Sequence, residues 1–333
     1  MLILSFSENG WTIEPLHINP MIGPSAETLI ALGAKQTSLI VNGNEWYRIF
    51  SPMFLHAGVI HFVVNMCALW FIGSAVERTH GFFAAVFSFI IPGIGGNILS
   101  AIFLPQFITV GASGGIFGLI GACLVDIMMN WSLLFGKDVN HHEFGTTSRN
   151  IKIVILLMLD IGVNCLIGFT PLVDNFNHLG GMIFGILVGF SFIERISKEF
   201  FGAASGFFSR MKRVCARFFG LILCAATIMI TIVVLAESDG ISTPCPQCRY
   251  FSCLPFPFWK SPDERWWNCD DCGLVTADAR KESASGKFVE LILTCPDQQV
   301  KFVDISEESI FDENELSENL SLYCRKNCEN VLS

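Results

Sequence analysis

The sequence predicts an all-α, polytopic membrane protein in which a bundle of transmembrane helices is followed by a cysteine-rich domain outside the membrane. Of the 333 residues, 52% are hydrophobic and only 15% are charged, whereas soluble domains carry about a quarter charged residues. Six apolar runs each approach the roughly 20 residues that cross a bilayer. Eight of the 13 cysteines follow the last of these runs.

The six apolar runs are expected to be helices that cross the membrane. In the core of a bilayer no water can bond to an unpaired backbone group, so an apolar run there has to satisfy its backbone internally, as a helix does. The runs occupy residues 57–76, 82–104, 108–129, 153–170, 178–193 and 218–236.

The charges of the loops predict how the helices are oriented. Lys and Arg gather in loops 130–152 and 194–217, whereas loops 105–107 and 171–177 hold no basic residue. Because basic loops remain in the cytoplasm, the second pair of loops should face the lumen or the exterior. The tail, residues 237–333, should lie on that same side.

Composition divides the chain into four expected parts. Residues 1–56 form an N-terminal remnant of a first helix and a membrane-associated loop, and residues 57–196 form the helix bundle. Residues 197–236 supply a basic cytoplasmic loop and an additional helix, and residues 237–333 form the cysteine-rich domain. This last part holds nine Lys or Arg against 18 Asp or Glu, which accounts for the whole net charge of −9. Nucleic-acid binding needs a basic stripe, so nucleic acid is excluded as a partner.

The cysteines of the tail admit two interpretations. Cys245 and Cys248 form one C-x-x-C pair, and Cys269 and Cys272 form another, which is the ligand pattern of a zinc ribbon. A lumenal or external compartment is oxidising, however, and cysteines there form disulfides. The predicted topology therefore favours disulfides, with zinc as the alternative, and the sequence assigns no metal and no cofactor.

Ser113 and His178 are the candidate catalytic residues. Ser113 lies in the glycine-rich stretch that begins at Gly111, where a serine more commonly bonds to its own backbone or helps helices to pack. His178 opens a later run, and a histidine at membrane depth is costly enough to be a functional candidate, although an interhelical hydrogen bond would also explain it. The glycines that follow at four-residue spacing, beginning with Gly181, predict close contact with a neighbouring helix.

His61 and Asn65 lie four residues apart on the first apolar run and therefore project from one face. Two polar side chains there need a polar destination, which is either a structural network or the oxyanion of a reaction intermediate. A serine nucleophile needs a base and such oxyanion donors. Ser113 would be the nucleophile, with His178 as its base and this pair as the oxyanion donors. The loop charges predict that all four residues lie toward the non-cytoplasmic side.

Three motifs resemble those of the rhomboid intramembrane serine proteases, particularly the eukaryotic secretory-pathway group. The likeness runs from about residue 11 to 236, and the motifs stand in the order and spacing of that family. They are Glu45-Trp46-Tyr47-Arg48 through His56 with His61 and Asn65, then Gly111-Ala112-Ser113-Gly114, and finally Asp174-Asn175-Phe176-Asn177-His178 with Gly180, Gly181 and Gly185.

The resemblance implies a Ser–His dyad without a third acid, which cleaves single-span membrane proteins near the non-cytoplasmic side. Ser113 would be the nucleophile and His178 the general base, and the Ser113 backbone N–H would share the oxyanion hole with His61 and Asn65. The protein would act in the secretory pathway, at the Golgi or the plasma membrane, with its site facing the lumen or exterior. Residues that support the site would be Trp46, Arg48, His56, Gly111, Gly114, Gly181 and Phe117, which would stack on His178.

The chain departs from the family pattern at its N-terminus. The family core begins with a helix before the Trp-Arg loop, and here we expect that helix to be missing or reduced to the first few residues. A second hypothesis is therefore a non-catalytic rhomboid-like protein that binds membrane-protein clients and regulates their traffic or degradation. A third is a transporter, which the glycine-broken run at residues 92–96 would suit, but no inverted repeat is visible.

Overall fold

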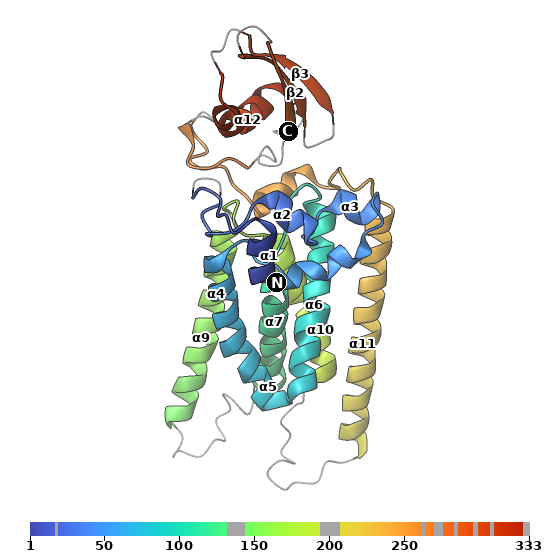
Figure 1. The fold of residues 1–333 in the computed structure, drawn as a ribbon. Coiled ribbons are helices and arrows are strands. Elements are labelled where there is room, and N and C mark those ends of the chain that lie inside the picture. The colour runs from blue at the N-terminus through green and yellow to red at the C-terminus, as the bar shows by residue number, and fades with distance from the viewer. Residues whose placement is uncertain are drawn as a thin grey trace. The chain divides into compact units, whose positions relative to one another are not determined.

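The computed structural model describes the chain as two compact units, Met1–Ser252 and Cys253–Ser333. The first unit is a helix bundle, and the second is a small sheet with one helix (Figure 1). The division into four parts expected from composition stays a prediction. The residues described are 1–333 without 17–18, 132–143, 194–206, 261–263, 270–275, 283–285, 296–298, 307–309 and 329–333.

All six predicted spans are helical, which confirms the all-α bundle. The first span is continuous from Val59 to His80 and contains a π-helical turn, and it is long and apolar enough to cross a membrane, as are α6 and residues Arg217–Ala236 of α11. The spans are α4 (Val59–Ala68) with η3 (Leu69–Gly73) and α5 (Ser74–His80), α6 (Phe82–Phe103), α7 (Ser113–Met129), α9 (Phe144–Ile167), α10 (Asn175–Phe192) and α11 (Phe207–Ala236).

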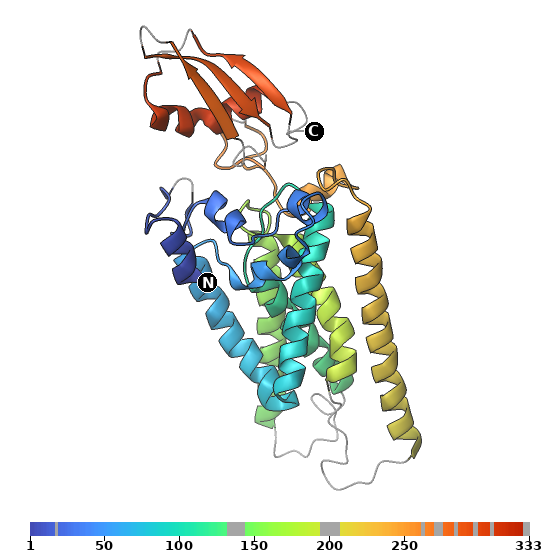
Figure 2. The ribbon, with the colours of Figure 1, turned by 45° about the vertical axis from the view of Figure 1, so that its right-hand side comes forward.

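Glycines let the three central helices pack with their backbones in close contact. Helix α10 packs against both α6 and α7, and α11 lies along α10 at the edge of the bundle (Figure 2). A Cβ on Gly181 would collide with the carbonyl of Gly114 on α7, and a Cβ on Gly180 would lie 2.9 Å from the Cα of Gly96 on α6. The close contact predicted for the glycine strip of α10 is therefore present.

The N-terminal region consists of short helices that pack onto the loop before α7. Lys35 and Thr109 pair backbone to backbone, and the N–H of Gly111 donates to the carbonyl of Pro52 at 2.9 Å. This region thereby fixes the chain just before Ser113. Its elements are α1 (Leu2–Glu8), α2 (Ala26–Ala31), α3 (Thr37–Val41), η1 (Trp46–Ile49) and η2 (Ser51–Phe54).

After α11 the chain runs across the ends of α6 and α10, through the short helix η6 (Pro246–Phe251). The Thr243 hydroxyl donates to the carbonyl of Phe103 at 3.0 Å, and the Asn175 side chain donates to the carbonyl of Phe251 at 2.6 Å. Residues 237–252 are consequently part of the first unit and are tied to the beginning of the helix that carries His178.

The second unit is a three-stranded antiparallel sheet in the order β1-β2-β3, covered on one face by a helix. Leu291 and Leu293 of the central strand are fully buried, in one core with Leu316 and Tyr323 of the helix. The sequence analysis did not predict this sheet. Its elements are β1 (Thr276–Lys281), β2 (Phe288–Thr294), β3 (Val300–Asp304) and α12 (Glu313–Asn327).

The tail cysteines that the structure describes form disulfides, which confirms the preferred interpretation over a zinc ribbon. Cys272, of the second C-x-x-C pair, lies outside the described residues. In the second unit, one disulfide closes a 16-residue separation and another ties the end of β2 to the residue after α12. The pairs found are Cys245–Cys248, Cys253–Cys269 and Cys295–Cys328.

Candidate active site

Ser113 is the first residue of α7, and the chain reaches it through a glycine that no other residue could replace without strain. Gly111 has φ of +124°, a conformation that L side chains rarely adopt. A Cβ at this position would lie 2.9 Å from Nε2 of His61 and 3.8 Å from Oγ of Ser113. The imidazole of His61 and the hydroxyl of Ser113 thus both lie beside Gly111.

His178 lies in the first turn of α10 and faces α7. Its ring stacks on Phe117, with centroids 4.1 Å apart and planes inclined by 13°, so the stack expected between these two residues is present. Gly114, next to Ser113, has no room for a Cβ because the Asn177 amide fills that space. Gly114 and Asn177, the neighbours of Ser113 and His178 in the chain, are therefore in contact.

His61 is oriented to donate a hydrogen bond toward the site. Its Nδ1 accepts the backbone N–H of Ala57 at 3.4 Å, which leaves the proton of the neutral ring on Nε2, the nitrogen beside Gly111. Asn65, one turn later and buried, donates to the carbonyl of His61 at 2.9 Å. One N–H of the Asn65 amide remains for a second acceptor.

His56 supports His61 from the loop before α4. The two imidazole rings meet edge to face, with centroids 5.5 Å apart, and Phe62 lies against His56 in the same way. His56 is only 3% exposed, and burial lowers its pKa from the ordinary value of 6.5 to about 4. A neutral His56 therefore packs as an aromatic ring.

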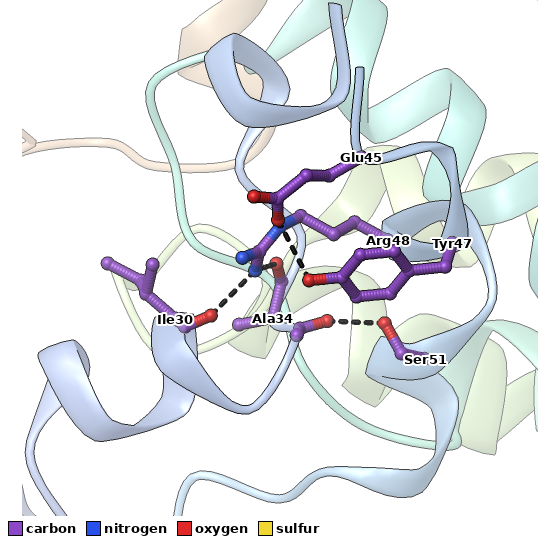
Figure 3. A network of polar contacts seen from close by, with 7 residues as sticks. Ile30, Ala34, Glu45, Tyr47, Arg48 and Ser51 are labelled. Carbon is purple, nitrogen blue, oxygen red and sulfur yellow. Dashed lines mark hydrogen bonds and ion pairs between the residues drawn. The ribbon is translucent and has the colours of Figure 1, made fainter. Parts of the chain in front are cut away.

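Arg48 holds the loop before α4 in shape (Figure 3). Its guanidinium is buried, and it donates to the carbonyls of Ile30 and Ala34 at 2.6 and 3.0 Å and to the carboxylate of Glu45 at 2.6 Å. Hydrogen bonds from Tyr47 and then Arg48 hold the pKa of Glu45 below its usual value. One cation thus bonds to two backbone carbonyls and a carboxylate. The neighbouring Trp46 packs against a hydrophobic cluster formed by α3, α6 and α11.

A half-buried carboxylate, Asp174, lies one turn before His178; the sequence assigned it no role beyond its place in the third motif. Asp174 caps α10 by accepting the N–H groups of Phe176 and Asn177 at 3.0 Å each. Its other oxygen accepts the hydroxyls of Ser100 and Thr109, the latter at 2.8 Å. The carboxylate therefore joins α10 to α6 and to the loop before α7.

A chain of amides makes a second link between the same segments. The Asn177 side chain donates to Asn97 at 2.6 Å, and Asn97 donates to the carbonyl of Ile49 at 2.9 Å. Both amides are buried. A signal for this network was available in the sequence, because Asn97 and Ser100 are polar residues three apart on the otherwise apolar α6.

The arrangement contains residue types that acyl-transfer chemistry uses: a hydroxyl at the start of α7, an imidazole in the first turn of α10, and His61 and Asn65 on α4. Among the described residues, no group of three or more His, Cys, Asp or Glu side chains is placed to hold a metal ion. The absence of a metal or cofactor from the chemistry stays a prediction.

Comparison with known proteins identifies the bundle. The family model "Rhomboid domain" matches residues 43–195. RHOMBOID-like protein 1 of Arabidopsis thaliana is 34% identical over 260 residues, which are 75% of this chain and 64% of that protein. Rhomboid protease GluP of Bacillus subtilis (strain 168) is 33% identical over 223 residues, which are 67% of this chain and 37% of that protein.

A further relative bears on catalysis. Inactive RHOMBOID-like protein 8 of Arabidopsis thaliana is 26% identical over 266 residues, which are 76% of this chain and 72% of that protein. This chain thus spans less than two thirds of two of these relatives. The chain is therefore similar in sequence to one relative named as a protease and to one named as inactive.

Proposed function

The chain belongs to the rhomboid family of multi-pass membrane proteins, and on that premise we propose that it is an intramembrane serine endopeptidase. Ser113 and His178 form its catalytic dyad, with His61 and Asn65 as side-chain donors of the oxyanion hole. Its substrates are single-span membrane proteins, which it cleaves near the non-cytoplasmic side of the bilayer.

One observation carries this proposal: the first turns of α7 and α10 pack closely together. Gly114, next to Ser113, touches Asn177, next to His178. Gly114 has no space for a Cβ against Asn177, and the ring of His178 is held flat against Phe117, one turn after Ser113. A nucleophile and base held in this way spend little entropy in reaching a reactive geometry.

The proposed reaction proceeds in two halves through an acyl-enzyme. Oγ of Ser113 attacks the scissile carbonyl carbon while His178 takes the hydroxyl proton. The oxyanion that forms accepts hydrogen bonds from the backbone N–H of Ser113, Nε2–H of His61 and the Asn65 amide. Collapse of the intermediate breaks the C–N bond, and His178 gives its proton to the leaving amine. Water then hydrolyses the ester, with His178 again as base.

The proposed compartment is the secretory pathway, at the Golgi or the plasma membrane, with the site facing the lumen or exterior. Two observations support this. Short loops rich in Lys and Arg alternate with loops that hold none, and the cysteines beyond α11 form disulfides, which persist in oxidising compartments.

The second candidate function is binding of membrane-protein clients without cleavage. The inactive relative supports it, because the chain shares 26% of aligned residues with that protein. The presence of Ser113, His178, His61 and Asn65 in this sequence favours the protease.

A serine-directed fluorophosphonate probe tests the choice. Detergent-solubilised wild-type protein should be labelled, and Ser113→Ala and His178→Ala should not, because only a serine with an adjacent base becomes nucleophilic. Cleavage of a single-span model substrate should follow the same pattern. Equal capture of that substrate by all three forms, with neither labelling nor cleavage, would establish the client-binding function instead.

A further inference from the structure

The Thr109 and Asp174 side chains stand at matching positions before the two catalytic residues. Thr109 precedes Ser113 by four residues, and Asp174 precedes His178 by four. The Thr109 hydroxyl donates to the Asp174 carboxylate at 2.8 Å. A single hydrogen bond therefore joins the chain one turn before the nucleophile to the chain one turn before the base.

Capping alone does not account for this arrangement. One carboxylate oxygen of Asp174 is sufficient to cap α10, since it accepts both free N–H groups, and an Asn would cap a helix about as well. The second oxygen is used differently. It accepts hydroxyls from Ser100 on α6 and Thr109 in the loop before α7, and these hydroxyls also lie 3.2 Å from each other.

The setting makes these bonds strong. Ser100 is fully buried and Thr109 is 8% exposed, so little water competes for these two hydroxyls. A hydrogen bond to a charged acceptor is roughly twice as strong as one between neutral groups. The Asp174 carboxylate is itself half-buried, and a charge partly withdrawn from water needs hydrogen-bond partners. The loop of the nucleophile is consequently held to the helix of the base.

Among the described residues, no hydrogen bond holds the imidazole of His178. Its buried Nδ1 lacks a hydrogen-bond partner, unlike the base of a serine protease that has a third acid. Its ring is oriented by the Phe117 stack, and its backbone by the first turn of α10, where its N–H donates to the carbonyl of Asp174 at 3.2 Å. The position of that turn therefore determines the position of the base.

We propose that Asp174 is a positioning residue of the dyad, which sets the separation of Ser113 and His178 through its hydrogen bonds to Thr109 and Ser100. This inference rests on the proposed protease function. Asp174 does not touch the reacting atoms, and it acts by holding the two segments in register. Small displacements of reacting groups, on the order of 1 Å, can reduce rates about 100-fold.

Two variants separate this role from capping. Thr109→Val keeps the size of the side chain and leaves the cap and its charge intact, but removes the bond between the segments. Asp174→Asn keeps a capping oxygen and removes the charge. Thr231→Val is the matched control, because its hydroxyl bonds only within α11.

Three readouts should be made on the full chain: kcat and KM for a single-span model substrate in detergent, hydrogen exchange of backbone amides near residues 174–180, and the temperature of unfolding. We expect both site variants to lower kcat about tenfold or more with KM within about twofold, since binding is retained and alignment is lost. Exchange near residues 174–180 should quicken, and the unfolding temperature should change little. The control should match the wild type.

Wild-type kcat in both site variants would overturn the inference, and so would a fall in kcat that the Thr231→Val control shares. A wild-type protein that neither cleaves nor binds the serine probe would overturn the proposed function instead. In that case hydrogen exchange still tests whether Asp174 and Thr109 link the two segments. Faster exchange near residues 174–180 in Thr109→Val supports the link, and unchanged exchange refutes it.

Discussion

The ring of His178 lies flat on the ring of Phe117, with centroids 4.1 Å apart. Phe117 is on α7, one turn after Ser113, so the helix that carries the nucleophile also supplies the surface on which the base rests. Both rings are buried, with exposed fractions of 6% and 7%. Since Nδ1 of His178 has no hydrogen-bond partner among the described residues, stacking is the contact that sets the ring plane.

Removing this stack should impair catalysis more than folding. We expect Phe117→Ala to lower kcat of substrate cleavage about tenfold or more, because the imidazole can then rotate away from Ser113. Phe117→Tyr should retain most of the activity because it keeps the stacked ring. Phe87→Ala is a control, since Phe87 stacks on Phe192 outside the site. Equal losses of kcat in Phe117→Ala and Phe87→Ala would show that the stack has no special role.

The contact between α7 and α10 has no room for another methyl group at Gly181. A Cβ there would collide with the backbone of Gly114, and backbone cannot move aside as a side chain can. Gly181→Ala should therefore lower the free energy of unfolding by about 1–3 kcal/mol, the usual cost of overpacking, and abolish probe labelling. Gly162→Ala on α9 is the matched control, because nothing lies within 4 Å of its added methyl. Thermal unfolding in detergent measures the stability of both variants, and the serine probe measures their labelling.

The oxyanion hole predicts a selective effect on the chemical step. Asn65→Ala removes one side-chain donor while leaving His61, Ser113 and His178 in place. We expect kcat to fall about 100-fold and KM to change little, because the interaction forms only in the transition state. Steady-state kinetics with a model substrate measures the two constants. An increase in KM at constant kcat would instead make Asn65 a substrate-binding residue.

Much of the bundle could be predicted because its causes are local in sequence. Apolar length specified the six spans, and glycine spacing specified the close face of α10. The network around Asp174 could not be predicted in this way, because its partners Ser100 and Thr109 are 74 and 65 residues away in the chain. Only the fold shows which hydroxyls meet a carboxylate.

The sheet of the tail was missed for a related reason. Its strands are short, and β3 is half-buried on one side and exposed on the other, with Phe302 70% exposed where a polar residue would have marked the outer face. Charged residues such as Lys281 and Asp304 at the strand ends also obscured the alternation. Periodicity over five to seven residues is a weak signal when exposed positions are apolar.

His56 should make the stability of the bundle depend on pH. Its pKa is about 4 in the folded protein, lowered by burial from 6.5, so between these values the unfolded chain binds a proton that the folded chain does not. Stability is then fully present above pH 6.5 and falls as the pH drops toward 4. His56→Phe keeps an aromatic ring against His61 and Phe62, and it should flatten this decline. Unfolding temperatures measured from pH 7.5 to 4 test the prediction, and parallel curves for the two proteins would contradict it.

Arg48 stabilises the loop that precedes the site through a buried set of hydrogen bonds. The residue is 3% exposed, and its guanidinium donates to two backbone carbonyls and one carboxylate. A lysine ammonium is a single point of charge and cannot reproduce this planar set of donors. Arg48→Lys should therefore leave at least one buried carbonyl unsatisfied, at a cost of about 1–3 kcal/mol in the free energy of unfolding.

The loss should spread from the Arg48 loop to the nucleophile, because Pro52 of the same loop accepts the N–H of Gly111 two residues before Ser113. Serine-probe labelling of Arg48→Lys should consequently slow together with the fall in stability. Arg249→Lys is the comparison: it makes the same substitution at a basic residue of the segment beyond α11, again without changing the net charge. If Arg48→Lys labels at the wild-type rate while its unfolding temperature falls, the loop stabilises the bundle without positioning the serine.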